Sequence, residues 1–199
     1  KVLNSDQPTL TKIHALFHLL NTSVFIFILL SALASVPLVE FLFSDPIDPT
    51  IMSYTYLFFV GFLLLAFFYW VANKQRYDNI VQAVFGFISS FPVFLGLSMG
   101  LSWHNAIAVV EGYIGRKTPF VRTPKFNLVK RTDSIANNRY HRINWRSVSI
   151  VEGVLAVYFA YGILQAIRLD YTPFIPFHTL LVFGFGGVFV YSIRHSLVK

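Results

Sequence analysis

The sequence predicts an all-α, polytopic membrane domain, and three observations lead to this fold class. Hydrophobic residues make up 55% of the 199 residues and charged residues only 13%, a balance typical of membrane proteins. Four apolar runs reach or approach the ~20 residues that a helix needs to cross about 30 Å of hydrocarbon. Most lysines and arginines lie between those runs. A single water-soluble domain does not fit this pattern.

Four segments are predicted to span the membrane as helices. They cover residues 13–37, 54–71, 148–167 and 173–193. The second segment ends in Tyr69 and Trp70, whose amphipathic rings suit a membrane–water interface. The link between the first two segments contains three acids and no lysine or arginine, so we place it on the non-cytoplasmic side.

The distribution of charge predicts which side faces the cytoplasm. Residues 116–146 hold nine lysines and arginines and one acid, Asp133. This cluster, together with Lys74, Arg76 and the basic C-terminus, can lie on one side of the bilayer. We therefore expect an integral protein of the plasma membrane, a bacterial inner membrane, with both ends cytoplasmic. The formal charge of +7 needs no nucleic acid as partner, and we expect none.

Residues 80–101 are apolar but contain Ser89, Ser90 and Pro92, which favour a short or re-entrant helical hairpin. Residues 102–115 follow with an amphipathic pattern at helical spacing, which predicts a helix lying in the cytoplasmic interface. Two ordinary crossings between residues 80 and 115 remain the alternative. In either case the basic stretch 116–147 is predicted to be a cytoplasmic loop.

Polar residues within the first span form a stripe at helical spacing, His14, His18 and Asn21. The two histidines have an i, i+4 spacing that could hold a metal, but no further histidine or carboxylate lies nearby, so we expect no metal site. An inward-facing polar stripe that lines a path for a polar substrate is the alternative function.

A second set of polar residues follows one side of the third span, Tyr158, Tyr161 and Gln165. Aromatic faces with hydroxyl groups suit sugar rings, although helix packing explains the same pattern. Glu152 lies about one turn inside this span, where an ionisable residue indicates either a functional site or a pair with a nearby arginine. The glycines of GFGGVF in the last span, Gly184, Gly186 and Gly187, predict close helix packing.

The stretch GLSWHNAIAVVEGYIGRKTPFVRTPKFN, residues 100–127, resembles the membrane-embedded family 2 glycosyltransferases, which include cellulose synthase and the glucomannan mannosyltransferases. In that family an interface helix leads into a gating loop with the pattern Phe/Trp-x-x-Thr-x-Lys. Phe120, Thr123 and Lys125 match this pattern. The order of two spans, interface helix, loop and two spans matches as well.

The resemblance implies that the chain is the C-terminal channel region of a longer processive transferase. The family transfers a sugar from a UDP or GDP donor to a growing glycan and takes the glycan across the membrane. The Asp-x-Asp, the base and the Gln-x-x-Arg-Trp motif belong to an upstream catalytic domain, so we expect no catalytic residue here. This region would bind no cofactor itself, with Mg or Mn in the absent domain.

The resemblance also assigns roles to individual residues. Phe120 would mark the insertion point of the gating loop, Thr123 would approach the nucleotide and Lys125 would neutralise its phosphates. Non-motif cations would steer the anionic donor, namely Arg116, Lys117 and Arg122. The glycan path would touch both polar sets described above.

Two alternatives stay open on sequence grounds. One is a non-enzymatic polytopic membrane module, such as a transporter subunit or a scaffold. The other is a non-processive transferase that acts once on a lipid-linked acceptor.

Overall fold

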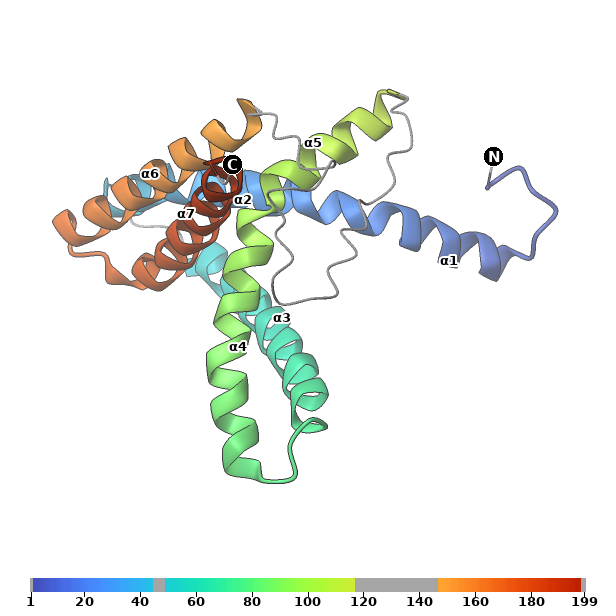
Figure 1. Cartoon of the computed structure of the whole chain (residues 1–199), viewed down its shortest axis with the longest axis horizontal. Coiled ribbons are helices and arrows are strands. Elements are labelled where there is room, and N and C mark those ends of the chain that lie inside the picture. The colour runs from blue at the N-terminus through green and yellow to red at the C-terminus, as the bar shows by residue number, and fades with distance from the viewer. Residues whose placement is uncertain (1, 45–48, 117–146, 198–199) are drawn as a thin grey trace.

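The computed structural model describes residues 2–44, 49–116 and 147–197, and these ranges fold as helices without a strand (Figure 1). The elements in chain order are α1 (Thr9–Leu20), η1 (Asn21–Ser23), α2 (Val24–Ser44), α3 (Pro49–Lys74), α4 (Ile80–Gly100), α5 (Ser102–Tyr113), α6 (Ser147–Arg168), η3 (Thr172–Phe174) and α7 (Ile175–Leu197). Within the described residues, four helical stretches are long and apolar enough to cross a membrane, Thr9–Leu42, Ile80–Gly100, Ser149–Arg168 and Thr172–Arg194. The predicted all-α, membrane-type architecture is thus confirmed at this level.

Three of the four predicted spans coincide with long apolar helices. The first lies within the rod formed by α1, η1 and α2, the third matches α6, and the fourth matches η3 and α7. The predicted span 54–71 lies within α3, whose apolar part in the described residues is Val60–Lys74.

The hairpin predicted within residues 80–101 is wrong, because these residues form the single helix α4. The side chain of Asn79 caps this helix by accepting a hydrogen bond from the Val81 amide at 2.8 Å. The hydroxyl groups of Ser89 and Ser90 both donate to the carbonyl of Gly86, at 3.1 and 2.6 Å. The hydroxyl groups of both serines therefore find hydrogen-bond acceptors within their own helix, and the helix continues through these residues.

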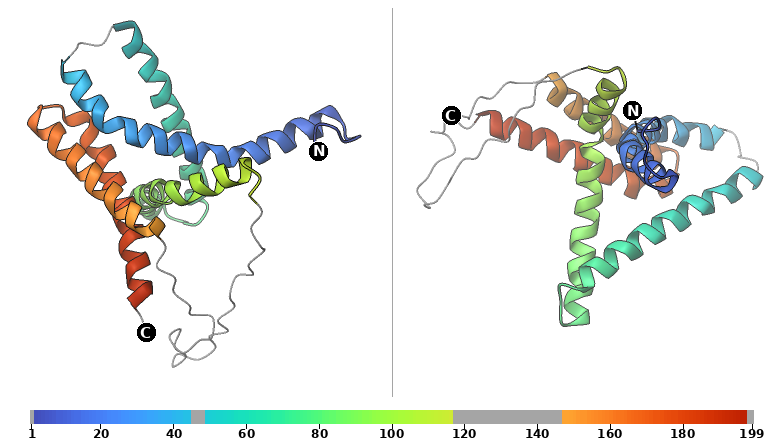
Figure 2. Two further views of the ribbon diagram at one scale, coloured as in Figure 1. Left: turned by 90° about the horizontal axis from the view of Figure 1, so that it is seen from above. Right: turned by 90° about the vertical axis from the view of Figure 1, so that its right-hand side faces the viewer.

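The core joins α2, α5, α6 and α7. Its buried members are Leu29, Ala32, Val36, Ala106, Leu155, Phe159, Leu181 and Phe185. Helices α6 and α7 run side by side as an antiparallel pair linked by a short turn, in which Asp170 has a positive φ of 52° (Figure 2). Helices α3 and α4 run in opposite directions from the turn that joins them and diverge with distance from it, and this α3–α4 pair projects away from the rod of α1 and α2 (Figures 1 and 2).

Glycines bring the backbones of α4 and α7 into contact. A Cβ atom added to Gly184 would overlap the carbonyl of Gly96, and one added to Gly100 would overlap the carbonyl of Gly184. The packing role predicted for the last-span glycines is confirmed for Gly184. It does not extend to Gly187, around which a Cβ would meet nothing within 4 Å.

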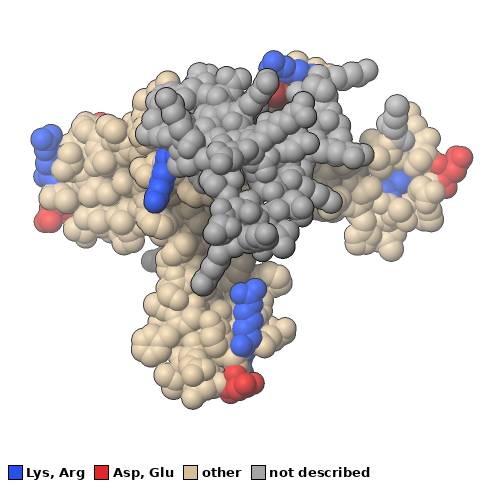
Figure 3. Space-filling model, in the orientation of Figure 1, with Lys and Arg blue, Asp and Glu red and all other residues tan. Residues whose placement is uncertain are grey.

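The outer surfaces of the long helices are apolar. Phe85 and Val157 are each 71% exposed, and Ile114 at the end of α5 is 78% exposed. The charged side chains visible in Figure 3 are few and scattered, and most of the described surface around them is uncharged. Such extended apolar surfaces suit contact with lipid chains better than contact with water.

Candidate functional site

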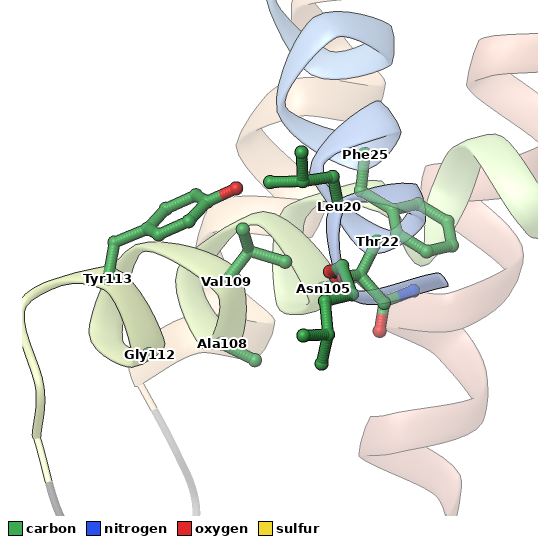
Figure 4. A pocket seen from close by; sticks show the side chains of 9 residues that line it. Leu20, Thr22, Phe25, Asn105, Ala108, Val109, Gly112 and Tyr113 are labelled. Carbon is green, nitrogen blue, oxygen red and sulfur yellow. Dashed lines mark hydrogen bonds between the residues drawn. The ribbon is translucent and has the colours of Figure 1, made fainter. Parts of the chain in front are cut away.

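A hollow of about 500 Å³ lies between α5 and the junction of α1 and α2 (Figure 4). Leu20 and Phe25 form part of its apolar wall, and Thr22, Asn105 and Tyr113 bring polar groups to it. The hydroxyl groups of Tyr113 and Ser23 are hydrogen-bonded, which ties the end of α5 to η1.

The predicted polar stripe of the first span lies beside this hollow without lining it. His14, His18 and Asn21 are all exposed, and Asn21 stands between the lining residues Leu20 and Thr22. Asn21 is therefore the member of the stripe nearest the hollow along the chain.

The second predicted polar set joins α6 to α2. The Tyr158 hydroxyl donates to the carbonyl of Leu33 at 2.7 Å. Glu40 accepts hydrogen bonds from Gln165 Nε2 at 2.6 Å and from the Tyr161 hydroxyl at 3.3 Å. These contacts agree with the helix-packing alternative for all three residues.

The structure keeps the two predicted polar sets apart. Asn21 and Glu40 are nineteen positions apart along the α1–α2 rod, which corresponds to about 28 Å at ~1.5 Å per residue. A glycan path that touches both sets would have to follow much of the length of this rod.

The predicted nucleotide-facing residues mostly lie outside the described residues. These are Lys117, Phe120, Arg122, Thr123 and Lys125. Arg116 is described and forms an ion pair with Glu111, with 2.5 Å between Nη1 and Oε1. Before it, Gly115 has a φ of +76°, the left-handed conformation with which helices commonly end.

A close contact between a half-exposed histidine and a buried carboxyl group links α5 to α6. Nδ1 of His104 lies 2.5 Å from Oε1 of Glu152, whose side chain is completely buried. The sequence indicated Glu152 as a candidate but suggested an arginine as its partner. The partner is a histidine from the helix on the other side of the 117–146 segment, a contact that no local pattern reveals.

Sequence reasoning missed His178, which is fully buried near the start of α7. Its Nε2 lies 2.9 Å from Oγ of Ser35 on α2, and that hydroxyl donates to the carbonyl of Ala32 at 2.6 Å. Nε2 of His178 is therefore the donor to Ser35. The available signal was an ionisable residue within an apolar span.

Ser35→Ala should lower the thermal unfolding midpoint of the detergent-solubilised protein by a few degrees, because it leaves Nε2 of His178 without its hydrogen-bond acceptor. Interhelical hydrogen bonds in membrane proteins contribute about 0.6–1.7 kcal/mol. Ser89→Ala is the matched control, because the Ser89 hydroxyl is exposed and bonds only to its own helix. Equal midpoints for the two variants would show that the Ser35–His178 contact does not stabilise the protein.

Among the described side chains, no group of three or more histidines and carboxylates is placed to hold a metal ion. Comparisons with known protein families, with curated proteins and with solved structures gave no match. The resemblance to the family 2 glycosyltransferases therefore rests on the motif residues and on the order of the helices.

Proposed function

We propose that this chain is the membrane region of a family 2 glycosyltransferase, which presents a gating loop to the nucleotide sugar and carries the glycan across the bilayer. The observation that carries this proposal is α5. It is a separate helix of 12 residues that ends directly before the basic segment containing Phe120, Thr123 and Lys125. The partners in this proposal are a catalytic domain of the same protein, a UDP or GDP sugar, and Mg or Mn in that domain.

The environment of α5 supports its role as an interface helix. Ser102 and Ala106 are buried on its inner side, and the helix packs against α2. Val110 and Ile114 continue the same i, i+4 row toward the end of the helix, where their apolar side chains are exposed. A helix that packs against a spanning helix at its start and exposes apolar side chains at its end suits a position at the membrane surface.

The contacts of α5 also explain how a gating loop would be anchored. The His104–Glu152 pair ties the helix before the loop to the helix after it, and the Tyr113–Ser23 hydrogen bond ties its end to η1. In this proposal Lys125 neutralises the donor phosphates and Thr123 approaches the nucleotide while the base of the loop stays in place. Arg116, Lys117 and Arg122 raise the local concentration of the anionic donor.

The hollow beside α5 is the proposed entrance for the glycan. Its apolar wall includes the ring of Phe25, and an amide and hydroxyls line it at Asn105, Thr22 and Tyr113. Sugar rings have apolar faces and hydroxyl rims, so this combination fits them. The position next to the proposed gating loop brings the entrance close to where a donor would react.

Ala108→Trp in the full-length protein should reduce glycan synthesis at least about ten-fold, because the indole would fill the hollow that Ala108 lines. Nucleotide binding should be unchanged, since the catalytic domain is not altered. Val110→Trp, at an exposed position of the same helix that does not line the hollow, is the matched control and should keep wild-type synthesis. Wild-type glycan synthesis by Ala108→Trp would rule out the hollow as the entrance without ruling out the transferase.

A non-enzymatic transport module is the second candidate, and one observation favours it. Glu152 and His178 are fully buried within apolar helices, and ionisable residues in such positions mark ion and proton pathways. Proton flux into proteoliposomes that is lost in Glu152→Gln, without any use of nucleotide sugars, would select this candidate.

A further inference from the structure

The α3–α4 pair carries a groove that neither the proposed entrance nor the gating loop uses. The groove has a volume of about 270 Å³ and lies between the C-terminal part of α3 and the middle of α4. Its lining residues are Tyr69, Ala72, Asn73, Arg76, Phe87, Ser90, Phe91 and Phe94. Aromatic rings dominate one part of it, and Arg76 is the charged residue among the described residues that line it.

The aromatic part is a connected wall. The rings of Tyr69 and Phe94 have centroids 4.5 Å apart, and those of Phe87 and Phe91 stack at 4.9 Å. Trp70 meets Phe87 edge-on at 5.6 Å. These contacts fix the rings without filling the groove, so an apolar chain can lie along them.

The end of the groove that contains Arg76 lies at the turn between α3 and α4. Nδ2 of Asn73 donates to the carbonyl of Ala83 at 2.9 Å, which joins the end of α3 to the first turn of α4. Arg76 follows three residues later and forms no ion pair with another described residue, in contrast to Arg116. Residues 74–78 contain two cations, Lys74 and Arg76, and one acid, Asp78. Charged groups are visible near the lower end of the α3–α4 pair in Figure 3.

We propose that this groove binds an anionic membrane phospholipid, with the headgroup phosphate at Arg76 and one acyl chain along the aromatic wall. The bilayer is the source of the ligand because the outer surfaces of both helices are exposed and apolar, with Phe67 64% exposed and Phe85 71% exposed. An arginine at the end of an apolar helix lies at the headgroup level and attracts anionic lipids. A guanidinium group also fits a phosphate with two parallel hydrogen bonds.

The test is native mass spectrometry of the full-length protein in a neutral detergent, titrated with phosphatidylglycerol and, separately, with phosphatidylcholine. The wild type should bind phosphatidylglycerol about five-fold more tightly, the ratio expected for one interfacial cation. Arg76→Gln should lose this preference. Lys74→Gln, which removes a neighbouring cation that does not line the groove, should keep it.

A second variant tests the apolar half of the site. Ser90→Trp should fill the groove and weaken the binding of both lipids, while Ser89→Trp, one residue away and outside the lining, should not. Retained preference in Arg76→Gln, or equal loss in Lys74→Gln, would overturn the proposal. Displacement of phosphatidylglycerol by an equal concentration of inorganic phosphate would also overturn it, because a phosphate site alone would then explain the binding.

Discussion

Lys125→Ala in the full-length protein is expected to lower the turnover of the nucleotide sugar roughly ten- to hundred-fold. In the proposed gating loop this lysine neutralises the donor phosphates, and a hydrogen bond to a charged group contributes about 1.5–3 kcal/mol. Thr123→Ala removes an uncharged contact and should reduce turnover by about ten-fold or less. The measurement is the initial rate of nucleotide release, with expression and membrane insertion checked in parallel.

The controls for these variants come from the same segment. Lys130→Ala and Thr118→Ala remove a lysine and a threonine that are not part of the Phe-x-x-Thr-x-Lys pattern. Both should leave turnover close to the wild-type value. Equal losses in the motif and control variants would mean that the segment acts through its general charge, and wild-type rates throughout would count against a gating role.

Gly184→Leu is expected to separate α4 from α7 and to lower the thermal unfolding midpoint by about 10 °C. An added side chain at this position meets the backbone of Gly96 and Gly100, which cannot move aside as a side chain could. Overpacking costs about 1–3 kcal/mol where side chains can adjust, and ~1 kcal/mol shifts the midpoint of a chain of this size by ~2–4 °C. Size-exclusion chromatography and thermal unfolding in detergent measure both effects.

Gly187→Leu is the matched control, three residues further along the same helix. A Cβ at Gly187 would meet nothing within 4 Å, so this variant should unfold close to the wild-type midpoint. If both leucine variants lose the same stability, the cause is the helix propensity or solubility of α7 and not the crossing with α4.

The spans were largely predictable because composition and length decide whether a helix can cross a bilayer. Residues 148–167 and 173–193 needed only an apolar run of sufficient length, and both predictions agree with α6 and α7. The prediction failed at α4, where polar residues were expected to break the helix. Ser89 and Ser90 instead bond to their own backbone, which a count of polar residues does not reveal.

The contacts between distant helices could not be predicted from the sequence. The sequence indicated packing at Gly184 but not its partners Gly96 and Gly100, because small residues occur in many places in membrane helices. Glu152 was a candidate, and its partner His104 lies 48 positions earlier on another helix. Such pairs follow from how the helices pack, whereas periodicity describes one helix at a time.

The most direct test of the proposed function is a nucleotide-sugar screen with the full-length protein in proteoliposomes containing Mg or Mn. Nucleotide release and glycan length would be measured for each UDP and GDP sugar. We predict that at least one donor yields free nucleotide and a long glycan, and that Lys125→Ala lowers the rate of nucleotide release and the amount of glycan. Products with a single added sugar would select the non-processive transferase. Folded wild-type protein that releases no nucleotide from any donor would contradict the account.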